Sequence, residues 1–152
     1  MSAAFNLKRI LVPVDFSDAS SYAVEWARRV GGFSGAELIF LHVIVPEAPV
    51  GIEDLPASCA DELKENANEN LRAMVQAARN SGDESAKSLT RCGLPTHEIV
   101  EAAKELDVDL VVIATHGYTG WKHFCIGSTA ERVVRAAPCP VLVIRKKEHE
   151  FI

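Results

Sequence analysis

Residues 109–131 read DLVVIATHGYTGWKHFCIGSTAE, and this stretch decides the predicted fold. An apolar run over residues 110–114 ends abruptly and is followed by a loop that contains Gly117 and Gly120, and a helix opens at Gly127–Thr129. Many α/β proteins bind phosphate where a strand feeds a glycine-bearing loop into a helix, because free N–H groups and the helix dipole favour an anion there. The stretch therefore predicts a nucleotide-binding module.

The rest of the chain alternates between short apolar runs and amphipathic stretches. Strands are predicted at residues 10–14, 38–43, 86–92, 110–114 and 141–144, and helices from Ser17 to Gly31-Gly32, over about 59–80, after Gly93-Leu-Pro95 and from Gly127. Three prolines and a glycine predict a loop at residues 45–58. Strands that alternate with helices indicate an α/β fold with a mainly parallel sheet covered on both faces. We expect one domain over residues 1–152.

Composition and charge narrow the function classes. The 152 residues are 48% hydrophobic and 24% charged, which is typical of a globular protein. The net charge is −5 without a basic patch, so we do not expect nucleic acid as a partner. There is no Cys-x-x-Cys pair, signal peptide or membrane-spanning apolar run, so we expect reduced thiols and a cytoplasmic location. No metal site is predicted, and no nucleophile lies next to a plausible base.

Two strand ends offer groups for a ligand. In doubly wound sheets, ligands sit beyond the carboxyl ends of the strands, where the strand order reverses. Residues 13–15 follow the first strand and residues 114–117 follow the fourth. If these strands are neighbours, an acidic group and the phosphate loop face each other across one crevice.

These motifs resemble the universal stress protein family, in its A type. The similarity covers nearly the whole chain, with ILVPVDFS at residues 10–17, LHV at 41–43, GLP at 93–95 and PCPVLVI at 138–144. Nucleotide-binding members share the pattern Gly, two residues, Gly, nine residues, Gly, Ser or Thr. Gly117, Gly127 and Ser128 match it, and Ala114 occupies the first glycine position. The resemblance implies a doubly wound, Rossmann-like sheet of five strands in the order 3-2-1-4-5, and ATP as ligand, with Mg²⁺ on its phosphates as an option.

The resemblance also implies a set of binding residues, namely Pro13, Asp15, Val43, Ala114, Thr115, His116, Gly117, Gly127, Ser128 and Thr129. Pro13, Asp15 and Val43 would line the adenosine end, with Val43 acting through its backbone. Residues 114–117 would lie along the ribose and phosphates, and residues 127–129 would donate N–H and hydroxyl groups to the phosphates. Only this last group, residues 127–129, is also predicted from the residue pattern without the resemblance.

Several of these residues have a purely structural alternative. Gly117 and Gly120 suit tight turns, and His116 suits a packed or exposed loop. Ser128 and Glu131 form a capping-box pattern, so Ser128 is a candidate cap for its own helix. Asp15 is a candidate for stabilising the N-terminus of the first helix.

Three functions compete. The first is an ATP-binding regulatory or stress-response module with little or no catalysis. The second is a dimeric interaction protein without nucleotide, because the methyl group of Ala114 closes off a tight backbone approach. The third is a small hydrolase or nucleotidyl transferase, although Asp15-Phe-Ser-Asp18 stands where the serine-glycine-glycine loop of ATP pyrophosphatases is expected.

A homodimer is also expected. Residues 141–144 form a four-residue apolar run that should lie at a sheet edge, and an exposed apolar edge invites strand pairing. The family resemblance implies that this strand pairs with its copy across a two-fold axis.

Overall fold

A computed structural model describes residues 6–46, 57–115 and 127–145 of the chain. The elements follow in the order β1 (Arg9–Pro13), α1 (Asp18–Gly32), β2 (Glu37–Ile44), α2 (Ala57–Asn80), β3 (Lys87–Cys92), α3 (Pro95–Glu105), β4 (Leu110–Ala114), α4 (Ser128–Ala136) and β5 (Val141–Ile144). The predicted alternation of strands and helices is confirmed. The helix α2 begins two residues earlier than expected, and residues 47–56 of the predicted loop lie outside the described residues.

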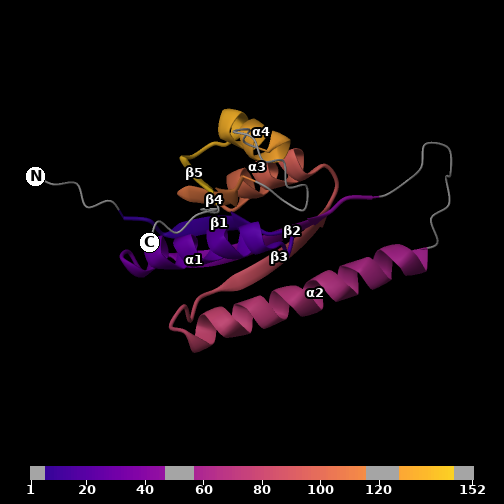
Figure 1. Ribbon diagram of the computed structural model, residues 1–152, viewed down its shortest axis with the longest axis horizontal. Helices are drawn as coiled ribbons and strands as arrows, with labels where there is room; N and C mark the ends of the chain where they lie inside the picture. Colours follow the sequence, from indigo (N-terminus) through magenta and orange to yellow (C-terminus); the bar gives the residue numbers. More distant parts are fainter. Residues whose placement is uncertain (1–5, 47–56, 116–126, 146–152) are drawn as a thin grey trace, which may run out of the picture.

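The five strands form one sheet in the order β3-β2-β1-β4-β5 (Figure 1). Every described strand pair is parallel, which confirms the predicted order and sharpens "mainly parallel" to fully parallel. The polar β3 lies at one edge, as predicted from its composition, and β5 lies at the other. The order reverses between β1 and β4, so the carboxyl ends of these two strands flank the switch point.

Two hydrophobic layers cover the sheet. On one face, Ala23 and Ala27 of α1 and Leu71 of α2 pack on Ile10 and Val12. On the other face, α3 and α4 pack through Ile99, Ala103 and Val133 on Leu11, Ile39 and Val111, with α3 and α4 side by side in Figure 1. The central strand β1 is apolar on both sides because both faces are covered. Each of its fully buried side chains contributes roughly 1.5–3 kcal/mol to folding.

The ends of the elements follow the local sequence rules. Ser17 caps α1, where its side chain accepts a hydrogen bond of 3.2 Å from the Ser20 amide, as predicted. Pro13, which has no N–H, is the last residue of β1, also as predicted. Across the described residues, no helix combines the length and the apolar character required to cross a membrane.

Candidate functional site

A pocket of about 350 Å³ opens at the carboxyl ends of β1 and β4. These strands are direct neighbours, with Ile10 paired to Leu110 and Leu11 to Val111, and residues 13–15 and 114–115 at their carboxyl ends line the same pocket, as expected. The described residues that line the pocket are Pro13, Val14, Asp15, Ser20, Leu41, Val43, Val45, Pro95, Ile99, Ile113, Ala114, Thr115, Gly127, Ser128, Thr129 and Ala130. A pocket of this size is at the small end of the range for small-molecule sites.

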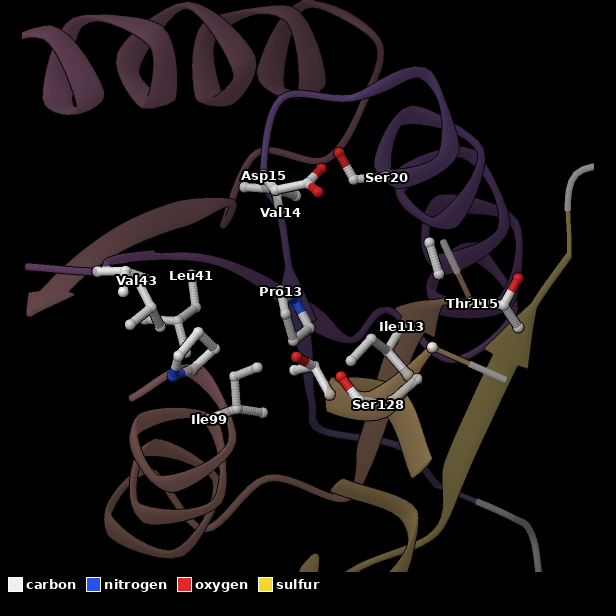
Figure 2. A pocket seen from close by; sticks show the side chains of 16 residues that line it. Pro13, Val14, Asp15, Ser20, Leu41, Val43, Ile99, Ile113, Thr115 and Ser128 are labelled. Atoms are coloured by element: carbon white, nitrogen blue, oxygen red, sulfur yellow. The ribbon is translucent and has the colours of Figure 1, made fainter. Parts of the chain in front are cut away.

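The structure brings together eight of the ten predicted residues, namely Pro13, Asp15, Val43, Ala114, Thr115, Gly127, Ser128 and Thr129. The other two, His116 and Gly117, lie outside the described residues. Figure 2 shows Asp15 and Ser20 on the side of the β1–α1 turn, Ser128 on the side of α4, and Pro13 between them. The acidic group and the start of α4 therefore belong to one pocket.

Sequence reasoning missed much of the apolar wall. Leu41 and Val45 come from β2 and the residues after it, and Pro95 and Ile99 come from the first turns of α3. The residues at the end of β2 and the start of α3 could have been proposed from the sequence, because every parallel strand presents its carboxyl end at the same side of the sheet. Only the strand order decides which of these ends approach one another.

Asp15 lies between β1 and α1 and is exposed to the pocket. Its Oδ1 accepts a hydrogen bond of 3.0 Å from the Ser17 amide and a second one from the Ser17 hydroxyl. The structural alternative for Asp15 is thus present, since the carboxylate stabilises the start of α1. Among the described residues, neither bond engages Oδ2, so this oxygen is available to accept a hydrogen bond from a ligand.

The junction between β4 and α4 is built on a close backbone contact. The Gly127 amide donates a hydrogen bond of 2.8 Å to the Thr115 carbonyl oxygen, which joins the two ends of the segment 116–126. A Cβ added to Gly127 would lie 2.3 Å from that oxygen, well inside van der Waals contact. The glycine is therefore required by proximity to Thr115, and its own N–H is already used inside the protein.

Helix α4 begins at Ser128, with Gly127 as its N-cap and no side-chain capping bond in the described part of the chain. The capping-box interpretation of Ser128 and Glu131 is wrong, because the Gly127–Thr115 contact starts the helix one residue too early for Ser128 to be the cap. In a helix, the first N–H groups have no intrahelical acceptor. The amides of Ser128, Thr129 and Ala130 therefore have no acceptor within α4, and these residues line the pocket at a helix end where the dipole favours negative charge.

Ala114 lines the pocket but does not close it. Its methyl group packs against the hydrophobic cluster on the α1 side of the sheet, and the pocket volume of about 350 Å³ exists with this methyl group in place. The pocket thus offers a carboxylate acceptor at one end, an apolar wall in the middle and open amides at the other end. These features suit a ligand with a donor-bearing, partly apolar body and an anionic group.

Comparisons with known proteins agree with this architecture. The model of the universal stress protein family matches residues 6–145. Universal stress protein MJ0531 of Methanocaldococcus jannaschii is 36% identical over 94% of this chain and 85% of its own length. The structure of universal stress protein UspA from Lactobacillus plantarum has a TM-score of 0.80 and 31% identity, covering 92% of this chain and 99% of that one. A universal stress protein solved in complex with cAMP has a TM-score of 0.69 and 26% identity, covering 93% and 99%. The chain belongs to the universal stress protein family.

Proposed function

We propose that this protein is an ATP-binding regulatory module of the stress response, with little or no catalytic activity. One observation carries the proposal: a single pocket joins the Asp15 carboxylate to the open amides at the start of α4. A relative of known structure holds cAMP, which supports an adenine nucleotide as the ligand class. Membership of the family supports the role in stress response.

The pocket fits such a ligand from both ends. Pro13, Asp15 and Val43 would hold the adenosine part, with Asp15 Oδ2 as the acceptor for an N–H or O–H group. The amides of Ser128 and Thr129, with their hydroxyl groups, would receive the phosphates. Mg²⁺ would be carried on the phosphate oxygens, which are its usual partners in nucleotide sites.

Regulation would follow from differential binding. A ligand shifts a conformational or assembly equilibrium only as far as it prefers one state. The module would therefore report the presence of ATP by changing its conformation or its partners, and turnover of the nucleotide would be slow or absent. Multiple turnover of ATP at a rate that falls in Asp15→Ala would contradict this part of the proposal and favour a hydrolase.

Calorimetric titration of the purified chain with ATP tests the proposal. We expect micromolar affinity in the wild type and a large loss in Gly127→Val, because its side chain cannot coexist with the Thr115 carbonyl. Gly32→Ala is a matched control, since nothing lies within 4 Å of a Cβ added there. Undetectable heat with a folded wild-type chain, together with no retained nucleotide by mass spectrometry, would refute ATP binding.

A second candidate function is a dimeric protein that acts through protein contacts without nucleotide. The alanine at position 114, where nucleotide-binding members have glycine, is the observation in its favour. Ala114→Gly separates the two candidates. If the methyl group blocks a tight approach, this variant gains ATP binding that the wild type lacks. If the wild type already binds ATP, the variant changes the affinity little.

The position of β5 at the edge of the described sheet supports a homodimer under either candidate. The carbonyl oxygens of Pro140 and Ile144 accept hydrogen bonds from the amides of Val111, in β4, and Thr115, directly after β4. In a parallel ladder, alternate residues face the neighbour, so the backbone groups of Val141 and Val143 face away from β4. Their half-buried apolar side chains leave an edge that a second copy could pair with across a two-fold axis.

Analytical ultracentrifugation of Val141→Lys tests this interface. We expect a monomer, because each copy would bring a charged side chain to the apolar edge where the two strands would pair. Leu63→Lys, an equal change at an exposed position of α2, should leave the dimer intact. Ile144 is unsuitable for this test because it is buried in the core. A dimer that survives Val141→Lys would place the interface elsewhere.

A further inference from the structure

His42 occupies a position that neither the pocket nor the core explains. Its neighbours in β2, Leu41 and Val43, pack on the α3–α4 face and line the pocket. Successive side chains of a strand point to opposite faces, so His42 lies on the α1–α2 face. Two contacts turn its ring toward the β1–α1 turn.

The first contact is a hydrogen bond across the end of the β1–β2 ladder. The pairing of the two strands ends at Pro13 and Leu41, and the Val14 amide still donates to the Leu41 carbonyl at 2.8 Å. His42 Nδ1 then lies 2.8 Å from the Val14 carbonyl oxygen. Because a carbonyl oxygen only accepts, Nδ1 carries the hydrogen and donates it. Val14 is thus tied to β2 through both its N–H and its carbonyl group.

The second contact is between aromatic rings. The Phe16 ring lies on the His42 ring, with a centroid distance of 4.6 Å and an interplanar angle of 32°. Phe16 has a φ of 63°, in the left-handed region that residues other than glycine rarely adopt. A conformation of this kind persists only where its surroundings favour it. The ring contact with His42 supplies such support.

Asp15 lies between these two contacts. His42 holds the carbonyl of the residue before it and the ring of the residue after it, and Ser17 holds its Oδ1. We propose that His42 is a positioning residue of the binding site, which acts through Asp15 by fixing the turn that presents this carboxylate to the ligand. This inference rests on the proposed nucleotide binding, and it assigns His42 to the adenosine end of the pocket.

The physical consequence is specific. Without His42, the Val14 carbonyl loses its donor and Phe16 loses the ring that supports its backbone, so Asp15 is free to leave the pocket-facing orientation. The energy that then orders the turn must come from ligand binding, which lowers the affinity. A residue that only stabilises the fold would lower the melting temperature and leave the affinity of the folded fraction unchanged.

A double-mutant cycle with adenosine as the probe tests the proposal, because adenosine has no phosphates and reports on the Asp15 end. We expect His42→Ala to weaken adenosine binding roughly three- to tenfold, the range of one net hydrogen bond. We expect the same change to have no further effect in an Asp15→Ala background, because residues that act as a unit are non-additive. Equal weakening in both backgrounds, or none in either, would overturn the inference.

Two conservative variants keep the test valid if His42→Ala does not fold. His42→Asn retains a donor near the Nδ1 position, and His42→Phe retains the ring without the donor. If the hydrogen bond to Val14 is the more important contact, we expect His42→Asn to retain most of the affinity. If the ring contact with Phe16 is the more important one, we expect His42→Phe to retain it. Wild-type affinity in both, with a folded chain, would overturn the proposal, as would losses in both that persist unchanged in Asp15→Ala.

Thr90→Val is the matched control. Thr90 pairs with His42 in the β2–β3 register, and its hydroxyl donates a hydrogen bond of 2.6 Å to Asn68. Loss of this hydrogen bond should lower the stability and leave adenosine binding unchanged. A fall in affinity equal to that of His42→Ala would overturn the assignment of His42 as a positioning residue. A wild-type chain that binds neither adenosine nor ATP would refute the proposed function itself. Wild-type binding with additive losses would refute the role of His42 alone.

Discussion

The parallel strands all begin on one side of the sheet, its amino edge, and all end on the opposite side, its carboxyl edge. Each of these two sides carries an aspartate that accepts main-chain hydrogen bonds, but the two carboxylates are used differently. At the amino edge, Asp109 precedes β4, and its Oδ2 accepts bonds of 2.8 Å and 2.9 Å from the amides of Lys8 and Arg9. At the carboxyl edge, Asp15 follows β1, and within the described part of the chain its hydrogen bonds are to Ser17, two residues further on. Asp109 therefore joins distant parts of the chain, whereas Asp15 orders its own turn beside an open pocket.

The surroundings of the two edges reinforce this contrast. At the amino edge, Glu37 forms ion pairs with Arg9 and Lys87, so the charges there are matched within the protein. Hydrogen bonds from the amides of Arg9 and then Lys8 lower the pKa of Asp109 below its ordinary value. At the carboxyl edge, Asp15 and the first residues of α4, Ser128 and Thr129, line the pocket. In open α/β sheets, ligands bind outside the carboxyl ends of the strands. In this sheet, the charged groups at the amino edge are engaged in hydrogen bonds and ion pairs within the protein.

The largest expected effect comes from the backbone contact at the carboxyl edge. Gly127→Ala puts a methyl group 2.3 Å from the Thr115 carbonyl oxygen, and backbone must move to relieve it. At the upper range for overpacked sites, about 3 kcal/mol, ATP affinity falls roughly a hundredfold. Calorimetry measures this loss, and Gly32→Ala should show none of it. ATP binding by Gly127→Ala at the wild-type level would show that the start of α4 takes no part in the site.

An intermediate effect separates the two aspartates directly. Asp15→Asn keeps the acceptor for Ser17 and removes the charge, so adenosine affinity should fall about tenfold, near 1.5 kcal/mol for a bond to a charged group, with little change in melting temperature. Asp109→Asn should leave the affinity unchanged and lower the stability. Thermal denaturation and calorimetric titration of both variants measure whether Asp15→Asn changes mainly the affinity and Asp109→Asn mainly the stability. If Asp109→Asn instead lowered the affinity and Asp15→Asn only the stability, the proposed division of roles between the two aspartates would be refuted.

The smallest expected effect is the pH dependence at the amino edge. The pKa of Asp109 is lowered on folding, so its carboxylate stabilises the native state above the ordinary pKa of about 3.9 and loses this effect as the pH falls through the folded-state pKa. The difference in unfolding free energy between wild type and Asp109→Asn should therefore be constant near neutral pH and vanish in acid. It should remain below about 1 kcal/mol, because solvent screens the group. Urea denaturation from pH 3 to 7 measures it, and a difference that grows in acid would contradict the assignment.

Much of the fold was predictable because its signals are local. The apolar run of β1 and the cap at Ser17 each depend on a few consecutive residues, and both predictions were confirmed. The family motifs added the strand order, and from it the meeting of Asp15 and Ser128 in one pocket. The capping box of Ser128 failed for a reason that local spacing does not contain. The Thr115 carbonyl, twelve residues before Gly127, sets where the helix starts.

Local sequence patterns were enough to predict the alternation of strands and helices, the burial of the central strand on both faces and the types of residue at the strand ends, because hydrophobic period and cap chemistry act over a few residues. Other features arise from the tertiary packing: His42 reaches Val14 and Phe16, Gly127 touches Thr115, and Asp15 lines the pocket while its Oδ1 bonds to Ser17. These contacts depend on how neighbouring strands and their loops are placed in space, to within a few tenths of an ångström. That placement comes from the packing of the whole sheet between its two helix layers.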